Sequence, residues 1–175
     1  FVLSGEVGSD LQGEDAKFPE GSSVLCGPTY RWSHISFKEG TRVFGAAVTP
    51  LGWCRLFVIE ANTLSDQSVS LADFVPAEAR AAIAGVHEAG SDDALVAAAD
   101  DFFAGLVSDQ WRVREDFLQL ATDWLLDPEP NSLQDLISQT ELSHRQTDRL
   151  CKAYFGAPPK RLHRKFRALH AANRL

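Results

Sequence analysis

The apolar pattern of this 175-residue chain changes its period once, and that change limits the folds it can adopt. Before residue 50, short runs are rich in Val, Phe, Trp and Ile, and Phe44, Ala46 and Val48 recur at every second position. This alternation predicts strands with one buried face. The strands are expected over Ser23–Cys26, Tyr30–Phe37 and Thr41–Thr49, with another short one at Phe1–Leu3.

From Pro76 onward the apolar residues follow a helical spacing instead, as Leu95, Ala98 and Phe102 do. Helices are expected over Ala77–Ala89, Ala94–Val107 and Trp111–Leu126, while Cys54–Ile59 fits either a helix or a strand. Strands followed by helices indicate an α+β fold. We expect a small antiparallel sheet with flanking helices, followed by an all-α helix-turn-helix module.

The charge of the chain changes sign at Asp127–Pro130, where two prolines end a helix. Residues 1–130 carry 8 Lys and Arg against 21 Asp and Glu, and residues 131–175 carry 9 against 3, so the net charges are −13 and +6. Basic charge gathered on one element is typical of nucleic-acid binders, because Lys and Arg displace the counterions of phosphates. We expect one domain over 1–108, with its sheet in about 1–75 and its helices in about 77–108, and a second over 109–175.

Residues 132–155 have the pattern of two short helices separated by a tight turn. Ser132 is a suitable N-cap for the first helix, and Ser143 opens the second with Gln146 three residues on, a capping box. The expected inward face of the second helix is Thr147, Leu150, Cys151 and Tyr154. With a basic outer face, this is the layout of a helix-turn-helix, whose second helix reads bases in the major groove. The alternative is a pair of helices whose charged face is merely solvated.

The outer face of the second helix predicts particular DNA contacts. The residues expected at base edges are Arg145, Asp148, Arg149 and Lys152, which share one helical face. Asp148 fits equally well as a partner for a neighbouring arginine. Gly156 suits the C-cap of this helix, and Pro159 suits the first turn of a further one. Lys160 and Arg161 follow at its N-terminus, where backbone amides favour an anion, so both are expected to contact phosphates.

These residues resemble the first half of the DNA-binding domain of AraC-type transcriptional regulators. The likeness runs through Gln134–Leu136, Leu142–Gln146, Phe155–Arg161 and Arg167–Ala171. Glu141 departs from the family, which usually has Gly in the turn. The resemblance implies that the helix from Pro159 links two helix-turn-helix units. The second unit is expected to be absent here, since the chain stops at Leu175.

The acidic part is similar to the sensor half of one AraC-type subgroup, in Phe44–Trp53, Leu64–Asp66 and Val69–Leu71. That similarity implies a partial cupin-like barrel followed by helices that pair two subunits. Residues 1–108 would then be a sensor and dimerisation domain, and the protein a homodimer.

The expected function is therefore sequence-specific regulation of transcription, with double-stranded DNA and a small-molecule effector as partners. An apolar effector pocket could be lined by Trp32, Phe44, Trp53 and Phe57, which otherwise belong to the core. The alternative is a protein-interaction or small-molecule sensing module that does not bind specific DNA.

The sequence shows no residue spacing that is typical of a catalytic site or a metal site. His34 and His87 lie far apart without an HxH motif, and the cysteines at 26, 54 and 151 form no CxxC pair. We expect no enzyme, no metal and no cofactor, and the cysteine usage fits a reducing cytoplasm. Charged residues interrupt the apolar stretches, so no membrane segment is expected.

Overall fold

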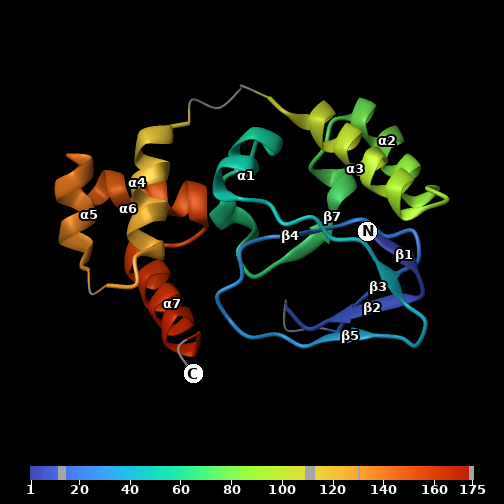
Figure 1. Ribbon diagram of the computed structural model, residues 1–175, viewed down its shortest axis with the longest axis horizontal. Coiled ribbons are helices and arrows are strands. Elements are labelled where there is room, and N and C mark those ends of the chain that lie inside the picture. Colours follow the sequence, from blue (N-terminus) through green and yellow to red (C-terminus); the bar gives the residue numbers. More distant parts are fainter. Residues whose placement is uncertain (12–14, 109–112, 130, 174–175) are drawn as a thin grey trace.

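The computed structural model describes residues 1–11, 15–108, 113–129 and 131–173 (Figure 1). Its strands are β1 (Val2–Ser4), β2 (Glu6–Ser9), β3 (Ala16–Pro19), β4 (Val24–Cys26), β5 (Ile35–Phe37), β6 (Arg42–Val43) and β7 (Ser68–Ser70). Its α-helices are α1 (Pro50–Leu56), α2 (Ala77–His87), α3 (Asp92–Leu106), α4 (Glu115–Leu126), α5 (Leu133–Thr140), α6 (His144–Phe155) and α7 (Pro159–Ala172). Short 3₁₀ helices, η1 (Ala61–Leu64) and η2 (Leu71–Asp73), flank β7. The expected α+β class is confirmed.

The strands form small antiparallel sheets rather than one continuous sheet: β1 pairs with β6, β2 lies between β3 and β5, and β4 pairs with β7. Val7 of β2 is opposite Phe18 on one side and Phe37 on the other. Gly5 turns the chain between β1 and β2 with a φ of 79°, and a Cβ there would lie 2.5 Å from Thr41 Oγ1. A glycine is therefore required at this corner.

The strand expected over Thr41–Thr49 is wrong beyond Val43, where β6 ends. The physical reason is the start of α1. The Thr49 hydroxyl accepts a hydrogen bond from the Gly52 N–H at 3.0 Å, and Pro50 takes the first helical position. Residues 44–49 therefore approach α1 as irregular chain.

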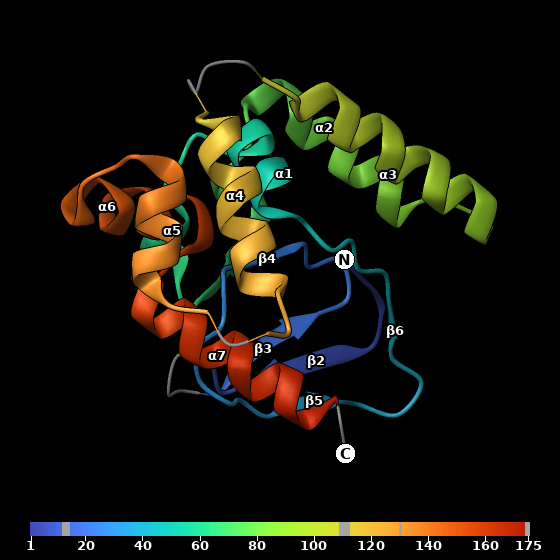
Figure 2. The same ribbon diagram turned by 60° about the vertical axis from the view of Figure 1, so that its left-hand side comes forward.

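Helix α1 covers Cys54–Leu56, the first half of the segment for which the sequence fitted either a helix or a strand. This helix belongs to a first core in the N-terminal half (residues 1–108). Trp53 and Phe57 are almost fully buried, with their ring centroids 5.0 Å apart. Val86 of α2 and Phe102 of α3 also belong to this core. Helix α3 begins at Asp92 after its N-cap Ser91, and it packs antiparallel beside α2 (Figures 1 and 2).

Helices α4–α7, the helical module (residues 113–173), surround a second core. Its buried members include Phe117, Ala121, Trp124, Leu136, Leu150, Tyr154 and Leu162. Cys54 of α1 also belongs to it, and Tyr30 packs against it, so the two cores meet at α1. Helix α4 begins at Glu115; Trp111, where this helix was expected to start, lies outside the described residues. Among the described residues, no helix combines the length and apolar character that a membrane span requires.

Helix α7 is held on α4 by His163. Its ring stacks on Trp124 with centroids 5.0 Å apart and planes at 15°, and its Nε2 lies 2.8 Å from Asn131 Oδ1. The Asn131 amide in turn donates to the Trp124 carbonyl at 2.8 Å. Burial, and secondarily the charge of Arg167, lowers the pKa of His163. The folded protein therefore favours the neutral imidazole.

We predict that protonation of His163 contributes to acid destabilisation. In the unfolded chain a histidine titrates near pH ~6.5, so the stability contributed by the neutral ring is fully present above that pH and is lost as the pH falls through the lowered pKa of the folded state. Urea unfolding across this range should show a shallower loss of unfolding free energy for His163→Gln than for the wild type. Parallel curves for the two proteins would contradict the prediction.

Candidate nucleic-acid interface

Helices α5 and α6 are both delimited by capping boxes. The Ser132 hydroxyl accepts from the Asp135 N–H at 3.3 Å, and the Asp135 carboxylate accepts from the Ser132 N–H at 2.6 Å. Ser143 and Gln146 repeat the exchange at 3.3 and 3.0 Å. Each box satisfies amides that a helix N-terminus leaves unpaired, so both helices begin where the sequence predicts.

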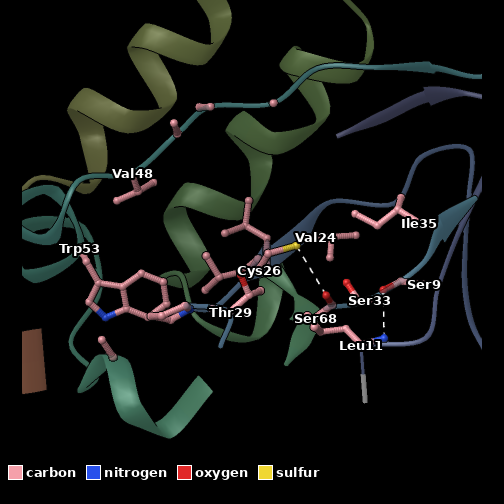
Figure 3. A pocket seen from close by; sticks show the side chains of 18 of the residues that line it. Ser9, Leu11, Val24, Cys26, Thr29, Ser33, Ile35, Val48, Trp53 and Ser68 are labelled. Atoms are coloured by element: carbon pink, nitrogen blue, oxygen red, sulfur yellow. Dashed lines mark hydrogen bonds between the residues drawn. The ribbon is translucent and has the colours of Figure 1, made fainter. Parts of the chain in front are cut away.

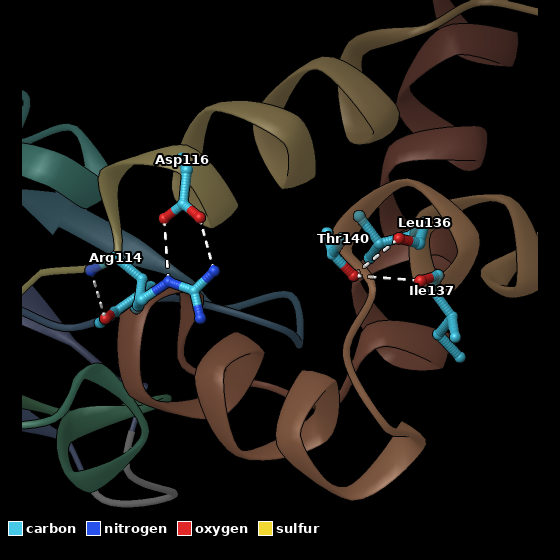
Figure 4. A network of polar contacts seen from close by, with 6 residues as sticks. Arg114, Asp116, Leu136, Ile137 and Thr140 are labelled. Carbon is cyan, nitrogen blue, oxygen red and sulfur yellow. Dashed lines mark hydrogen bonds and ion pairs between the residues drawn. The ribbon is translucent and has the colours of Figure 1, made fainter.

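The turn between these helices closes through two local features. The buried Thr140 hydroxyl donates to the Leu136 carbonyl at 2.9 Å, which completes the last turn of α5 (Figure 4). Glu141 then adopts a left-handed conformation with φ 54° and ψ 24°. The hydrogen bond and the left-handed residue reverse the chain towards Ser143.

The inward face of α6 is the one expected from the sequence. Thr147, Leu150, Cys151 and Tyr154 are all buried. Burial raises the pKa of the Cys151 thiol to about 12, so it is a packing group rather than a nucleophile. The Tyr154 hydroxyl accepts from the Arg114 N–H at 3.0 Å, and the Arg114 side chain binds the Asp116 carboxylate (Figure 4). The hydrogen bond of Tyr154 ties α6 to the start of α4.

The outward face of α6 divides into two parts. Arg145 and Arg149 are exposed, and within the described ranges neither makes an ion pair. Asp148 instead accepts from Lys152 at 2.7 Å, one turn further on, and both of these side chains are about two-fifths exposed. Of the four residues predicted to contact bases, Arg145 and Arg149 are therefore exposed without an ion pair among the described residues, whereas Asp148 and Lys152 pair with each other.

Of the two residues predicted to contact phosphates, one is free of ion pairs among the described residues and the other is paired. Lys160 is exposed at the start of α7. Arg161 lies 3.5 Å from Asp66 of the N-terminal half, with its guanidinium 4.8 Å from the centre of the Tyr30 ring. Four residues later, Lys165 Nζ donates to the Thr29 carbonyl at 2.5 Å.

The contact between the N-terminal half and the end of α6 was not found from the sequence. The Tyr30 hydroxyl donates to the Phe155 carbonyl, and the Ser65 hydroxyl donates to the Gly156 carbonyl at 2.7 Å. Gly156 has a φ of 85°, and a Cβ on it would lie 2.7 Å from Pro28 Cγ. The glycine therefore ends α6 and also admits the loop of the N-terminal half.

A cavity of about 760 Å³ lies between the strands, residues 44–50 and the helical module (Figure 3). Three of the predicted pocket residues, Phe44, Trp53 and Phe57, line it. Trp32 does not: it is 80% exposed and packs edge-on against His34, so its proposed place in the pocket is wrong. Lining residues that sequence reasoning missed include Tyr154, Phe155, Leu162, Lys165 and Phe166, which come from the helical module.

Metal-binding groups are not assembled in the part of the chain that the structure describes, where no three His, Cys, Asp or Glu side chains cluster. Comparisons with protein-family models, with curated proteins and with solved structures found no match to this chain. The geometry of the helical module and of the cavity is therefore the basis for any assignment of function.

We predict that Glu141→Gly stabilises the protein. A left-handed backbone costs a side-chain-bearing residue about 1–2 kcal/mol, and the greater flexibility of unfolded glycine offsets part of this, leaving a gain of about 0.5–1 kcal/mol. Glu141→Ala is the matched control, because it removes the same charge but keeps the strained conformation. Urea unfolding should show the gain for glycine alone; equal effects of both variants would attribute it to the charge.

Proposed function

We propose that this protein is a sequence-specific DNA-binding regulator of transcription whose α5–α6 pair is a helix-turn-helix. The observation that carries the proposal is the outward face of α6. Arg145 and Arg149 are exposed in its N-terminal half, while its opposite face is buried against the rest of the module. In a helix-turn-helix, this half of the second helix meets the base edges.

The charged residues of α6 and of the start of α7 fall into three roles in the proposal. Arg145 and Arg149 reach base edges, where a guanidinium can bind guanine O6 and N7 together. Asp148 orients Lys152 through their ion pair. Lys160 and Arg161 bind phosphates, which sets position and affinity but carries no sequence information. For Arg161, this requires that it exchange Asp66 for a phosphate.

The rival function, a small-molecule sensing module without specific DNA binding, is favoured by the cavity beside Trp53. Selection from a pool of randomised duplex DNA, followed by a salt titration on the enriched sequence, separates the two. A regulator should enrich one motif and show a log–log salt slope of roughly −0.9 per neutralised phosphate. Failure to enrich any motif would overturn the proposal.

We predict that Arg149→Ala weakens binding to the enriched sequence by about 1–3 kcal/mol and relaxes the base preference at one position. The physical reason is the loss of a bidentate contact to a base edge. Binding to the enriched duplex and to a scrambled duplex should be measured side by side. Equal losses on both would show that Arg149 touches only phosphate.

Lys160→Ala is the matched comparison, since it removes one exposed positive charge from α7 instead of α6. We predict a similar loss of affinity on the enriched and scrambled duplexes, and a salt slope smaller by about one phosphate contact. An unchanged salt slope would exclude the Lys160 contact.

The proposed homodimer is formed through α2 and α3. Their exposed faces are rich in small residues, including Ala81, Ala84 and Gly85 of α2, which permit close approach of helices. The C-terminal segments of two copies would repel each other, because residues 131–175 carry a net charge of +6 in each.

We predict that light scattering reports a dimer of the wild type at tens of micromolar. Ala84→Arg should shift the mass towards the monomer, because it places a bulky charge on the proposed contact. Lys38→Arg, which leaves the charge unchanged at an exposed loop site, should not. A wild-type monomer, or a dimer that persists in Ala84→Arg, would overturn this pairing.

A further inference from the structure

The cavity described above has the size and lining of a small-molecule site. Its volume of about 760 Å³ lies within the usual range of roughly 300–1,000 Å³ for such sites. Its walls come from both parts of the chain: Trp53 and Phe57 of the N-terminal half, and Leu162 and Phe166 of α7. Ser9, Ser33 and Thr29 add isolated polar groups (Figure 3).

Lys165 is the one charged side chain among the described residues that line this cavity. An ammonium group has three N–H donors. In the described part of the chain, Lys165 Nζ makes one hydrogen bond, to the Thr29 carbonyl, and lies 5.0 Å from the centre of the Tyr30 ring. It therefore retains capacity to donate to a ligand.

The electrostatic surroundings of Lys165 favour an anionic partner. Burial lowers the pKa of its ammonium group, and the charge of Asp66 acts against that change. Asp66, however, forms its ion pair with Arg161. No Asp or Glu lines the cavity among the described residues, so the charge of Lys165 has no carboxylate partner on the cavity side.

We infer that the cavity binds a small amphipathic anion, with its apolar body against Trp53, Phe57 and Phe166 and its single anionic group at Lys165 Nζ. The chemical class is an apolar molecule of drug-like size with one carboxylate, sulfonate or similar group. A neutral molecule of the same shape would fill the cavity but leave the positive charge of Lys165 without an anionic partner. The inference goes beyond DNA binding and is tested without DNA.

Two fluorescent probes that differ mainly in charge provide the test: 1-anilinonaphthalene-8-sulfonate and its neutral counterpart N-phenyl-1-naphthylamine. The full chain should bind the sulfonate saturably and one-to-one, and should bind the neutral probe about tenfold more weakly, the size of one charge-assisted hydrogen bond. Absence of saturable sulfonate binding, or equal affinities for the two probes, would overturn the inference.

The role of Lys165 is tested with Lys165→Met, which removes the charge and keeps the length of the side chain. It should reduce affinity for the sulfonate about tenfold and leave that for the neutral probe unchanged. Arg164→Met is the matched control, because it removes a charge from the adjacent, exposed position. Equal effects of the two variants on sulfonate binding would show that Lys165 acts only through its charge at long range. That result would overturn its assignment as the residue that binds the anionic group.

The location of the site is tested with two wedge variants, Ala47→Trp and Ser33→Trp. Each places a bulky side chain at a residue that lines the cavity. At least one of them should weaken both probes. Ala104→Trp adds the same bulk at an exposed position of α3 outside the cavity and should weaken neither. Circular dichroism confirms that each variant is folded. Unchanged binding of both probes in both wedge variants would place the ligand elsewhere and overturn the inference.

Discussion

The backbone at the end of α6 is the point on which the arrangement of the two halves depends. Carbonyls at a helix C-terminus have no partner within the helix, and here Tyr30 and Ser65 supply donors for those of Phe155 and Gly156. Gly156 makes this possible because it has no side chain to exclude Pro28. The residue that ends the proposed recognition helix thus also seats that helix on the N-terminal half, and α7 follows directly from it.

How well the sequence predicts this fold depends on how local each determinant is. The starts of α5 and α6 and the end of α6 were predictable because Ser132, Ser143 and Gly156 act on their own neighbours. The strand expected up to Thr49 was too long, because a cap and a proline outweigh an alternating pattern. The Asp66–Arg161 and Thr29–Lys165 contacts join distant parts of the chain, and no local pattern marks them. For the same reason, the helical wall of the cavity was missed.

The charge division along the sequence has a physical counterpart in the fold. The N-terminal half (residues 1–108), with 6 Lys and Arg against 15 Asp and Glu, contacts the basic segment of residues 131–175, which has 9 against 3. Asp66 and Arg161 form a specific ion pair across this contact, and a second pair of the opposite polarity joins Glu115 of α4 to Arg55 of α1 at 2.5 Å. Half-exposed pairs of this kind contribute little stability, so their main effect is to orient α7 and α4 on the N-terminal half.

Helix α7 joins the two proposed activities, because Arg161 and Lys165 lie one turn apart on it. Under these proposals α7 has a docked position, in which Asp66 holds Arg161, and a released one, in which Arg161 binds a phosphate. A ligand alters DNA affinity only if it binds these two positions unequally. A ligand held by Lys165 and the N-terminal half favours the docked position, in which Asp66 holds Arg161. DNA that draws Arg161 away from Asp66 favours release. Since linkage is reciprocal, each ligand would then weaken the other by the same factor, and the proposed anion would oppose DNA binding.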